Sequence, residues 1–341
     1  MRNLIPVIAL FAPVPAFAET TVPAPSKPTE PIAKTFSASK AAAFIDGVSL
    51  DWTRERDCAS CHTNCSYMLA RPKIKGGDPE PMKEIRKFLE DRVAGWEKEK
   101  PLADYDVVAT AYTLAASDSA TTGKLHPATR GALERMMKVQ RPNGSWKWSA
   151  CDWPPLEHDQ FYSVIYGLLA IGMAPDNFKN TPAAKEGIDN VRKYLKANPT
   201  TELHHKASLL WCSTKIDGVL TNDEKKHTIA DLRKQQLADG GWNLPALGPY
   251  PMRRDGKTAN DMTVGDGYAT GFVTFVLRQA GVPADDTALV KSIAWLKANQ
   301  RESGRWFTQS PGGSKAHYVT NVGSMFAVLA LDACGEKLVA E

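Results

Sequence analysis

The sequence predicts an all-α protein built from about six pairs of helices. Three segments share the pattern Gln-x3-Gly-x-Trp, and a pattern that recurs along a chain is typical of a repeated structural unit. An amphipathic helix is expected before each Gln, and a more uniformly apolar helix after each Trp. The three copies are Gln140 with Gly144 and Trp146, Gln236 with Gly240 and Trp242, and Gln300 with Gly304 and Trp306.

The amphipathic helix of each pair is expected on the outside and the apolar helix on the inside, because an apolar surface on nearly every side requires burial. The last outer helix shows the periodicity clearly, with Leu289, Ile293 and Leu296 at i, i+4 and i+7. The outer helices are expected near 39–57, 80–98, 127–140, 182–197, 222–236 and 286–300. The inner helices are expected near 64–70, 104–117, 158–173, 203–215, 266–281 and 318–333.

Proline and glycine support several of these boundaries. Pro127 and Pro182 stand where two outer helices begin, which is a favoured first-turn position. Gly172 and Gly281 are expected just after two inner helices, and each is followed by a proline within three residues. This local chemistry agrees with the helix assignment.

The N-terminus reads as an export signal. Arg2 precedes the largely apolar run from Leu4 to Phe11, and Ala16-Phe17-Ala18 has the small-residue spacing of a cleavage site. A short membrane anchor is the alternative, although the apolar run falls short of the roughly 20 residues that span a bilayer. We therefore expect a signal peptide at 1–18, a Pro/Thr-rich flexible tether at 19–35 and a single domain at 36–341, located in the periplasm or secreted.

Charge is spread along the chain, with 42 Lys and Arg against 38 Asp and Glu. No dense basic block is present, so nucleic acid is not an expected partner. No later segment is apolar enough to cross a membrane, which leaves peripheral membrane contact open. The expected partner is a small molecule or a redox protein.

Cys58-Ala59-Ser60-Cys61-His62 has the spacing of a haem c attachment motif. Two thiols at this spacing form thioethers to haem vinyl groups, and the adjacent His62 is placed to bind the iron. A zinc site of Cys58, Cys61, His62 and Cys65 is an alternative, because three thiolates and an imidazole make a tetrahedral ligand set. A disulfide between Cys58 and Cys61 is a third, since export permits it.

The Gln-x3-Gly-x-Trp segments resemble the QW repeat of squalene-hopene and oxidosqualene cyclases. Like protein prenyltransferase β subunits, those enzymes contain helix pairs arranged as an α/α toroid, so the resemblance, which covers about 80–335, implies an α6/α6 toroid here; an open helical solenoid is the alternative. The resemblance does not extend to the catalytic motifs of these enzymes. The cyclase Asp-x-Asp-Asp acid is missing, Asp104-Tyr105-Asp106 being the nearest match, and Cys151-Asp152 reverses the zinc-binding Asp-x-Cys order of the prenyltransferases.

The chain also resembles a bacterial type in which a helix ending in Trp and basic residues, here Trp52 to Arg56, precedes Cys-x2-Cys-His. That resemblance implies a repeat barrel with a haem motif and no particular activity.

In a closed ring every inner helix begins at the same rim, which we call the mouth. Its candidate catalytic residues are His158, Asp159, Asp106, Asp266 and His317. Asp is common at helix N-termini for capping alone, so a structural role for Asp266 is an equal reading. For a haem on His62, the candidate donors to the second iron face are His158, His204, His205 and His317, with His158 and His317 favoured.

Three functions follow from these patterns. The leading hypothesis is a periplasmic c-type haem protein on a toroid scaffold, which transfers electrons or oxidises or reduces a small apolar molecule. The second is an enzyme of the cyclase or prenyltransferase kind with acid or zinc chemistry at the mouth. The third is a non-enzymatic binding module.

Overall fold

The computed structural model describes residues 22–56, 58–78, 80–96, 104–149, 154–253, 256–312 and 318–341. The expected signal peptide at 1–18 and His317 lie outside these ranges. Six helices form the outer layer: α1 (Ala38–Arg56), α3 (Glu80–Gly95), α5 (Pro127–Lys138), α7 (Pro182–Ala197), α9 (Asn222–Lys234) and α11 (Thr287–Asn299). Six form the inner layer: α2 (Asn64–Ala70), α4 (Asp104–Ala120), α6 (Phe161–Met173), α8 (Leu203–Cys212), α10 (Gly267–Gln279) and α12 (Tyr318–Ala333).

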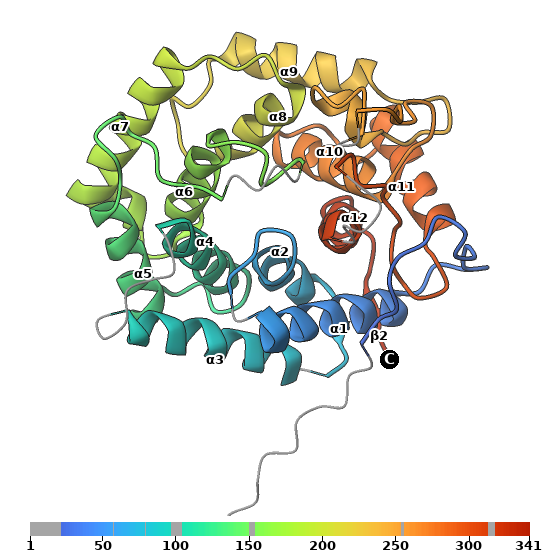
Figure 1. The fold of residues 1–341 in the computed structure, drawn as a ribbon, viewed down its shortest axis with the longest axis horizontal. Helices are drawn as coiled ribbons and strands as arrows, with labels where there is room; N and C mark the ends of the chain where they lie inside the picture. The colour runs from blue at the N-terminus through green and yellow to red at the C-terminus, as the bar shows by residue number, and fades with distance from the viewer. Residues whose placement is uncertain are drawn as a thin grey trace, which may run out of the picture.

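Outer and inner helices alternate around a ring, as Figure 1 shows. The predicted all-α toroid of six helix pairs is therefore confirmed. The described residues also form three short 3-10 helices: η1 (Arg71–Lys73) and η2 (Phe178–Asn180) between pairs, and η3 (Leu244–Leu247) within the fifth pair, between α9 and α10. The strands β1 (Lys75–Gly76) and β2 (Val339–Ala340) pair in parallel and join the first helix pair to the C-terminus.

One expected boundary was wrong in a way that matters, and one expected stop residue lies inside its helix. The inner helix expected from 158 begins at Phe161, because the Asp159 side chain accepts a hydrogen bond from the Phe161 N–H (2.8 Å) and the preceding residues form a turn. His158 and Asp159 thus stand in a loop and not on a helix. Gly172, expected to follow this helix, lies inside α6, which ends at Met173.

The three Gln-x3-Gly-x-Trp segments form the same turn three times. Each Gln side chain donates to the carbonyl of its own Gly and to a carbonyl at the start of the next outer helix; for Gln236 these are Gly240 and Ala288, at 2.9 and 2.7 Å. Each Trp is fully buried, and its indole N–H donates to the carbonyl ten residues earlier, as from Trp242 to Leu232 (2.7 Å). The turn therefore links an outer helix to its inner partner and to the next pair.

The third copy of this turn closes the ring. Gln300 donates to the Gly304 carbonyl (3.1 Å) and to the carbonyl of Ser37 (2.9 Å), which precedes α1. The backbone of Gly304, at φ +95°, lies so close to Lys40 that a Cβ would overlap the Lys40 carbonyl. The sixth helix pair is thus joined to the first by the same contact that joins earlier neighbouring pairs. The barrel is therefore closed and is not an open solenoid.

Part of the segment expected as a tether is packed on this last turn. Ala33 donates to the Gln300 carbonyl (2.8 Å), and Ile32 forms an antiparallel bridge with Arg301. The Glu30 carboxylate accepts from the Ser303 N–H (3.1 Å) and pairs with Arg305 (3.1 Å). Residues 30–33 are therefore part of the domain surface.

Aromatic side chains fill the inside of the barrel. Tyr162 of α6, Tyr268 and Phe272 of α10 and Phe326 of α12 are each at most 4% exposed. Phe272 packs edge-on against Phe326, with ring centroids 5.2 Å apart. Almost none of their surface is accessible to water. An enclosed cavity for a long apolar chain is not present between these four residues.

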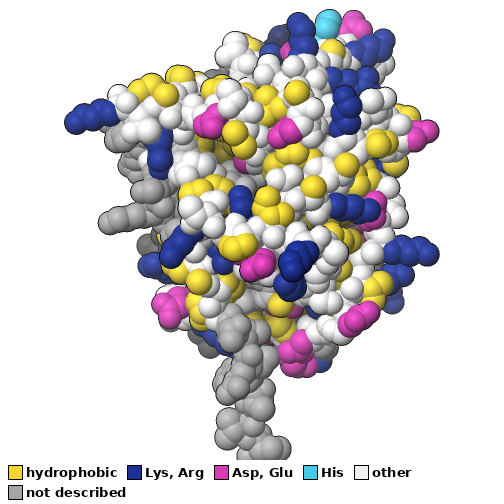
Figure 2. Space-filling view, turned by 90° about the vertical axis from the view of Figure 1, so that its right-hand side faces the viewer, with side chains coloured by type: hydrophobic (Ala, Val, Ile, Leu, Met, Phe, Trp, Pro, Cys, Tyr) yellow, Lys and Arg dark blue, Asp and Glu magenta, His cyan; other side chains and the backbone are white. Residues whose placement is uncertain are grey.

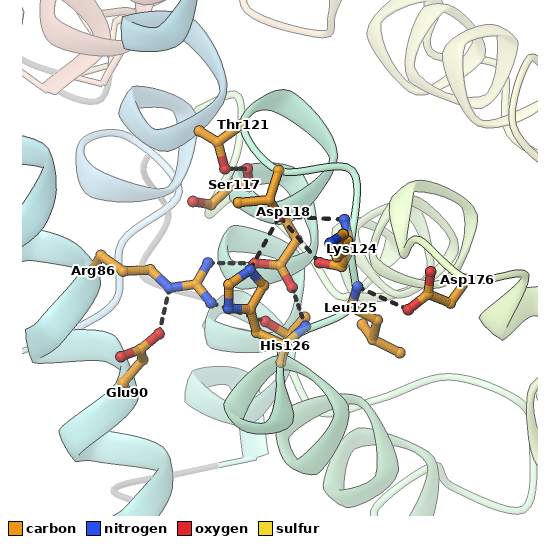
Figure 3. Close-up of polar contacts among 11 residues, drawn as sticks. Arg86, Glu90, Ser117, Asp118, Thr121, Lys124, Leu125, His126 and Asp176 are labelled. Atoms are coloured by element: carbon orange, nitrogen blue, oxygen red, sulfur yellow. Dashed lines mark hydrogen bonds and ion pairs between the residues drawn. The ribbon is translucent and has the colours of Figure 1, made fainter.

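At the other end of the inner helices a buried carboxylate holds neighbouring pairs together. Asp118, at the end of α4, is fully buried and pairs with Arg86 of α3 (2.5 Å), which also pairs with Glu90 (2.6 Å). The second Asp118 oxygen accepts from the N–H of His126, just before α5 (2.9 Å). Figure 3 shows Arg86 and Glu90 of α3, Asp118 of α4 and His126, which precedes α5, close together. The network has a structural role, because Asp118 and Arg86 are paired with groups of α3, α4 and the start of α5.

No helix among the described residues has the length and apolar character needed to cross a membrane. On the face drawn in Figure 2, Lys and Arg side chains are interspersed with Asp and Glu and with apolar residues. This face therefore carries both signs of charge side by side.

Candidate active site at the mouth of the barrel

The loops that lead into the inner helices meet at the predicted mouth. His62, before α2, stacks on Tyr318 at the start of α12, with ring centroids 4.4 Å apart. His158, before α6, lies edge-on to Tyr250, with centroids 5.4 Å apart. His205 in the first turn of α8 is 3.3 Å from Asp159. The mouth thus brings together residues that are distant in sequence, as the ring geometry predicts.

The Cys58-x2-Cys61-His62 motif lies at this mouth with His62 largely buried. The His62 Nε2 faces the Glu157 carboxylate at 3.4 Å, and the Cys61 Sγ lies 3.4 Å from the same carboxylate oxygen. The His62 ring is held between Tyr318 and Trp52, which packs edge-on against it at 4.7 Å. Glu157, which the sequence did not single out, therefore connects this motif to the loop before α6.

Burial keeps the three neighbouring thiols protonated. Burial raises the pKa of the half-buried Cys58 thiol, with Trp52 and Arg92 opposing it and Asp106 adding to it. Burial, with the Glu157 carboxylate, raises the pKa of Cys61 well above the ordinary value, and burial also raises that of Cys65. Thiols in this state are poor nucleophiles, because the thiolate is the reactive form.

The side chains around His62 do not fit an iron on Nε2 as they lie. Glu157 occupies the space in front of that nitrogen, and the adjacent pocket is small and lined by Pro154, Pro155, Leu156 and Val322. A porphyrin on this face of His62 requires the Glu157 side chain to move. The alternative zinc set of Cys58, Cys61, His62 and Cys65 is not among the described groups whose donor atoms converge.

One group of donor atoms does converge at the mouth. His158, Asp159 and Glu202 each offer an atom, and all three atoms lie within 4.8 Å of one another. His205 adjoins the group: its Nε2 is 3.3 Å from Asp159 and its Nδ1 is 3.9 Å from Glu202. Burial opposes ionisation of Asp159, yet the His205 imidazole and the Phe161 N–H hold its pKa below the ordinary value. We call these four residues the mouth cluster.

Two other candidate catalytic residues have structural partners. Asp106 is fully buried, and its two carboxylate oxygens lie 3.0 and 2.9 Å from the Nε of Arg92, which donates to both. Asp266 caps α10 by accepting from the Ala269 N–H (2.8 Å), and its other oxygen accepts from the Leu244 N–H (2.6 Å). Burial raises the pKa of Asp266 to about 6 in spite of these bonds. Asp266 is therefore a helix cap, which was one of its two expected roles. The fifth candidate catalytic residue, His317, lies outside the described residues.

His204 points into the barrel, away from its neighbour His205. It is fully buried between two phenols, with Nδ1 2.8 Å from the Tyr162 hydroxyl and Nε2 2.8 Å from the Tyr268 hydroxyl. Burial lowers its pKa well below the ordinary value, so the imidazole stays neutral. One phenol then donates to it and the other accepts from it. His204 is part of the filled core.

Sequence reasoning missed Glu157, Glu202 and Tyr250. Glu157 adjoins His158 and Glu202 is the residue before α8, so both were within reach of a search for acids beside the predicted histidines. Tyr250 carried no local signal, because it reaches His158 from the loop between α9 and α10.

No protein-family model and no curated protein sequence matches the chain. Solved structures match its fold. The chain is similar to a glycosidase, with a TM-score of 0.55 and 11% identity over 87% of this chain and 97% of that one. It is similar to the type II terpene cyclase MstE from Scytonema, with a TM-score of 0.52 and 12% identity over 86% and 97%. For ent-copalyl diphosphate synthase from Streptomyces platensis the TM-score is 0.50, with 14% identity over 79% and 50%.

These comparisons place the chain among α/α-toroid proteins, a class that includes type II terpene cyclases and a glycosidase. At 11 to 14% identity the likeness concerns the fold. The class therefore supplies a scaffold with a mouth, and the side chains at that mouth must carry any argument about chemistry.

Proposed function

We propose that this protein is an enzyme that acts on a small polar molecule at the mouth of the toroid, with His158, Asp159, Glu202 and His205 as its reactive groups. One observation carries the proposal: two imidazoles and two carboxylates from separate segments meet there, with three of their donor atoms within 4.8 Å of one another. Groups of this kind transfer protons and orient polar substrates.

The filled interior favours a substrate bound at the mouth. Tyr268 and Phe272 are almost completely buried by their neighbours, so they do not line the cavity that a long isoprenoid chain would need. Phe161, stacked on His205 at 4.4 Å, and Tyr250 give the mouth an apolar wall. A wall of aromatic rings beside a few polar groups is typical of small-molecule sites.

The experiment is a turnover screen of purified full-length protein. Because the fold neighbours are a glycosidase and terpene cyclases, the panel holds glycosides and geranylgeranyl compounds. With the substrate that turns over, Asp159→Asn should lower kcat/KM by roughly 100-fold or more, the usual contribution of one acid–base group. Glu186→Gln, an exposed substitution on α7, is the matched control and should leave turnover unchanged. Full activity in both Asp159→Asn and His158→Ala would contradict the proposal.

A second candidate is a c-type haem protein, favoured by the sequence Cys58-Ala59-Ser60-Cys61-His62 at the same mouth. A covalently held haem would supply redox chemistry; the two cysteines would anchor it and His62 would bind its iron, once Glu157 had moved. This candidate includes export through residues 1–18, since attachment takes place outside the cytoplasm. Protein made with c-type maturation should then carry haem by absorbance and intact mass, and a bare polypeptide mass would reject it.

A further inference from the structure

The mouth cluster has the arrangement of a metal site with an open position. The donor atoms of His158, Asp159 and Glu202 lie within 4.8 Å of one another. Around a tetrahedral zinc ion with bonds of about 2.1 Å, neighbouring donors are about 3.4 Å apart. Side-chain adjustments on the order of 1 Å would therefore bring the three donors into range.

A buried imidazole, that of His205, lies beside both carboxylates of the cluster. Its side chain is 4% exposed, and its Nε2 lies 3.3 Å from an Asp159 oxygen. The Nδ1 lies 3.0 Å from the Thr200 hydroxyl and 3.9 Å from Glu202. This imidazole therefore adjoins both carboxylates while stacking holds it against Phe161. Side chains that adjoin metal-binding carboxylates commonly hold those carboxylates in the orientation that the metal needs.

A buried oxygen of Glu202 points to the same conclusion. Its Oε2 is buried and makes no hydrogen bond, although the side chain as a whole is 23% exposed. An unsatisfied carboxylate oxygen beside a second carboxylate is unfavourable, because like charges repel and the buried oxygen has lost its water. A bound cation would relieve both effects.

The donor types select the class of ion. One imidazole nitrogen and two carboxylate oxygens suit first-row divalent metals such as Zn²⁺, whereas Ca²⁺ prefers six to eight oxygens. Two carboxylates balance the charge of a divalent ion. Three protein ligands leave a coordination position free for a substrate, as in catalytic zinc sites.

We propose that His158, Asp159 and Glu202 bind one divalent transition-metal ion of the Zn²⁺ type, and that His205 positions the two carboxylates. The inference rests on the proposed function in that it uses the same mouth cluster, but metal binding is measured without any substrate. The site is separate from the cysteine motif, whose donors are mainly sulfur.

The experiment titrates chelator-treated full-length protein with Zn²⁺ by calorimetry and with Co²⁺ by absorbance. One ion per chain is expected, and the Co²⁺ spectrum should lack the charge-transfer band of thiolate ligands. His158→Ala and Glu202→Gln should each weaken Zn²⁺ binding at least about tenfold, and His205→Gln about 10- to 100-fold. Circular dichroism and melting temperature confirm that each variant is folded.

Two controls make the result decisive. Glu186→Gln should bind Zn²⁺ as tightly as the wild type, and so should the double variant Cys58→Ser/Cys61→Ser, since the mouth cluster contains no thiol. Binding that disappears in the cysteine variant, or that persists unchanged in Glu202→Gln, overturns the proposal. A wild type that takes up no Zn²⁺ also overturns it. Zinc binding without turnover of any substrate would uphold the metal site while leaving the proposed function unsupported.

Discussion

The three Gln-Gly-Trp turns and the mouth cluster both lie where an outer helix passes to an inner one, yet they are built on opposite principles. The Gln and Trp side chains of each turn are hydrogen-bonded within the scaffold, as Gln236 is to Gly240 and Ala288. In the mouth cluster Glu202 has a buried oxygen without a hydrogen bond. The turns recur after α5, α9 and α11. The segments after α1 and α7 lack the pattern and carry Cys58–His62 and Glu202, and the segment after α5 carries His158 and Asp159 beyond its turn. In this molecule the repeated turns hold the ring, and loop residues outside the turns carry the reactive groups.

The largest effect on stability is expected from a turn tryptophan. Trp242 is fully buried and donates to Leu232, so Trp242→Ala should lower the free energy of unfolding by about 3 to 5 kcal/mol. Denaturant unfolding measures the change. Trp96→Ala, at a partly exposed position, is the control with a smaller expected loss. Equal losses of unfolding free energy in the two variants would mean that the turn tryptophan does not stabilise the ring more than a partly exposed tryptophan does.

A turn glycine should rank next. Gly144 has φ +90°, and a Cβ there would overlap the carbonyl of Asn190 in α7. Backbone strain together with this overlap predicts a loss of about 2 to 3 kcal/mol for Gly144→Ala. Gly123 also has a positive φ, +65°, but nothing lies within 4 Å of its Cβ position. Gly123→Ala should cost only about 1 kcal/mol, and a cost as large as that of Gly144→Ala would rule out the close approach as the cause.

The buried His204 should make the fold sensitive to acid. Because burial lowers its folded pKa, only the unfolded chain takes up this proton when the pH falls below the ordinary value of 6.5. Stability from this group is therefore present above that pH and lost below it, by up to about 1.4 kcal/mol per pH unit. The free energy of unfolding, measured with urea at several values between pH 7 and pH 5, should depend less steeply on pH for His204→Gln than for the wild type. His227→Gln, at an exposed position, should show the same pH dependence of the free energy of unfolding as the wild type.

The smallest effect on stability is expected at the mouth. Glu202→Gln removes a charge from a side chain that is 23% exposed, so the free energy of unfolding should change by less than about 1 kcal/mol. The same variant is expected to lose metal affinity, which separates function from fold at this position. A melting temperature lowered as far as that of Trp242→Ala would show that Glu202 is part of the scaffold, and the contrast between turns and mouth would fail.

Local sequence was sufficient for the helix pairs and insufficient for parts of the site. Apolar periodicity placed α2, α7 and α12 at the observed bounds. The helix expected from 158 was wrong at its start, because an Asp159 side-chain bond to Phe161 competes with the helix there. His158 and Asp159 were predicted at the mouth and are found there, whereas Asp106 and Asp266 have structural partners that spacing alone does not reveal.

The sequence by itself determined the number of helix pairs, the inner or outer place of each helix and the meeting of His62, His158 and His205 at one end, because periodicity and chain order are local properties. Only the tertiary structure decided that the ring closes, since Gln300 reaches Ser37 across 263 positions of sequence. It also decided which side chains share the mouth: Glu157 reaches His62, Glu202 joins Asp159, and His204 turns into the core while His205 does not. Such contacts depend on the direction of each side chain within a closed barrel, and no spacing along the chain contains that direction.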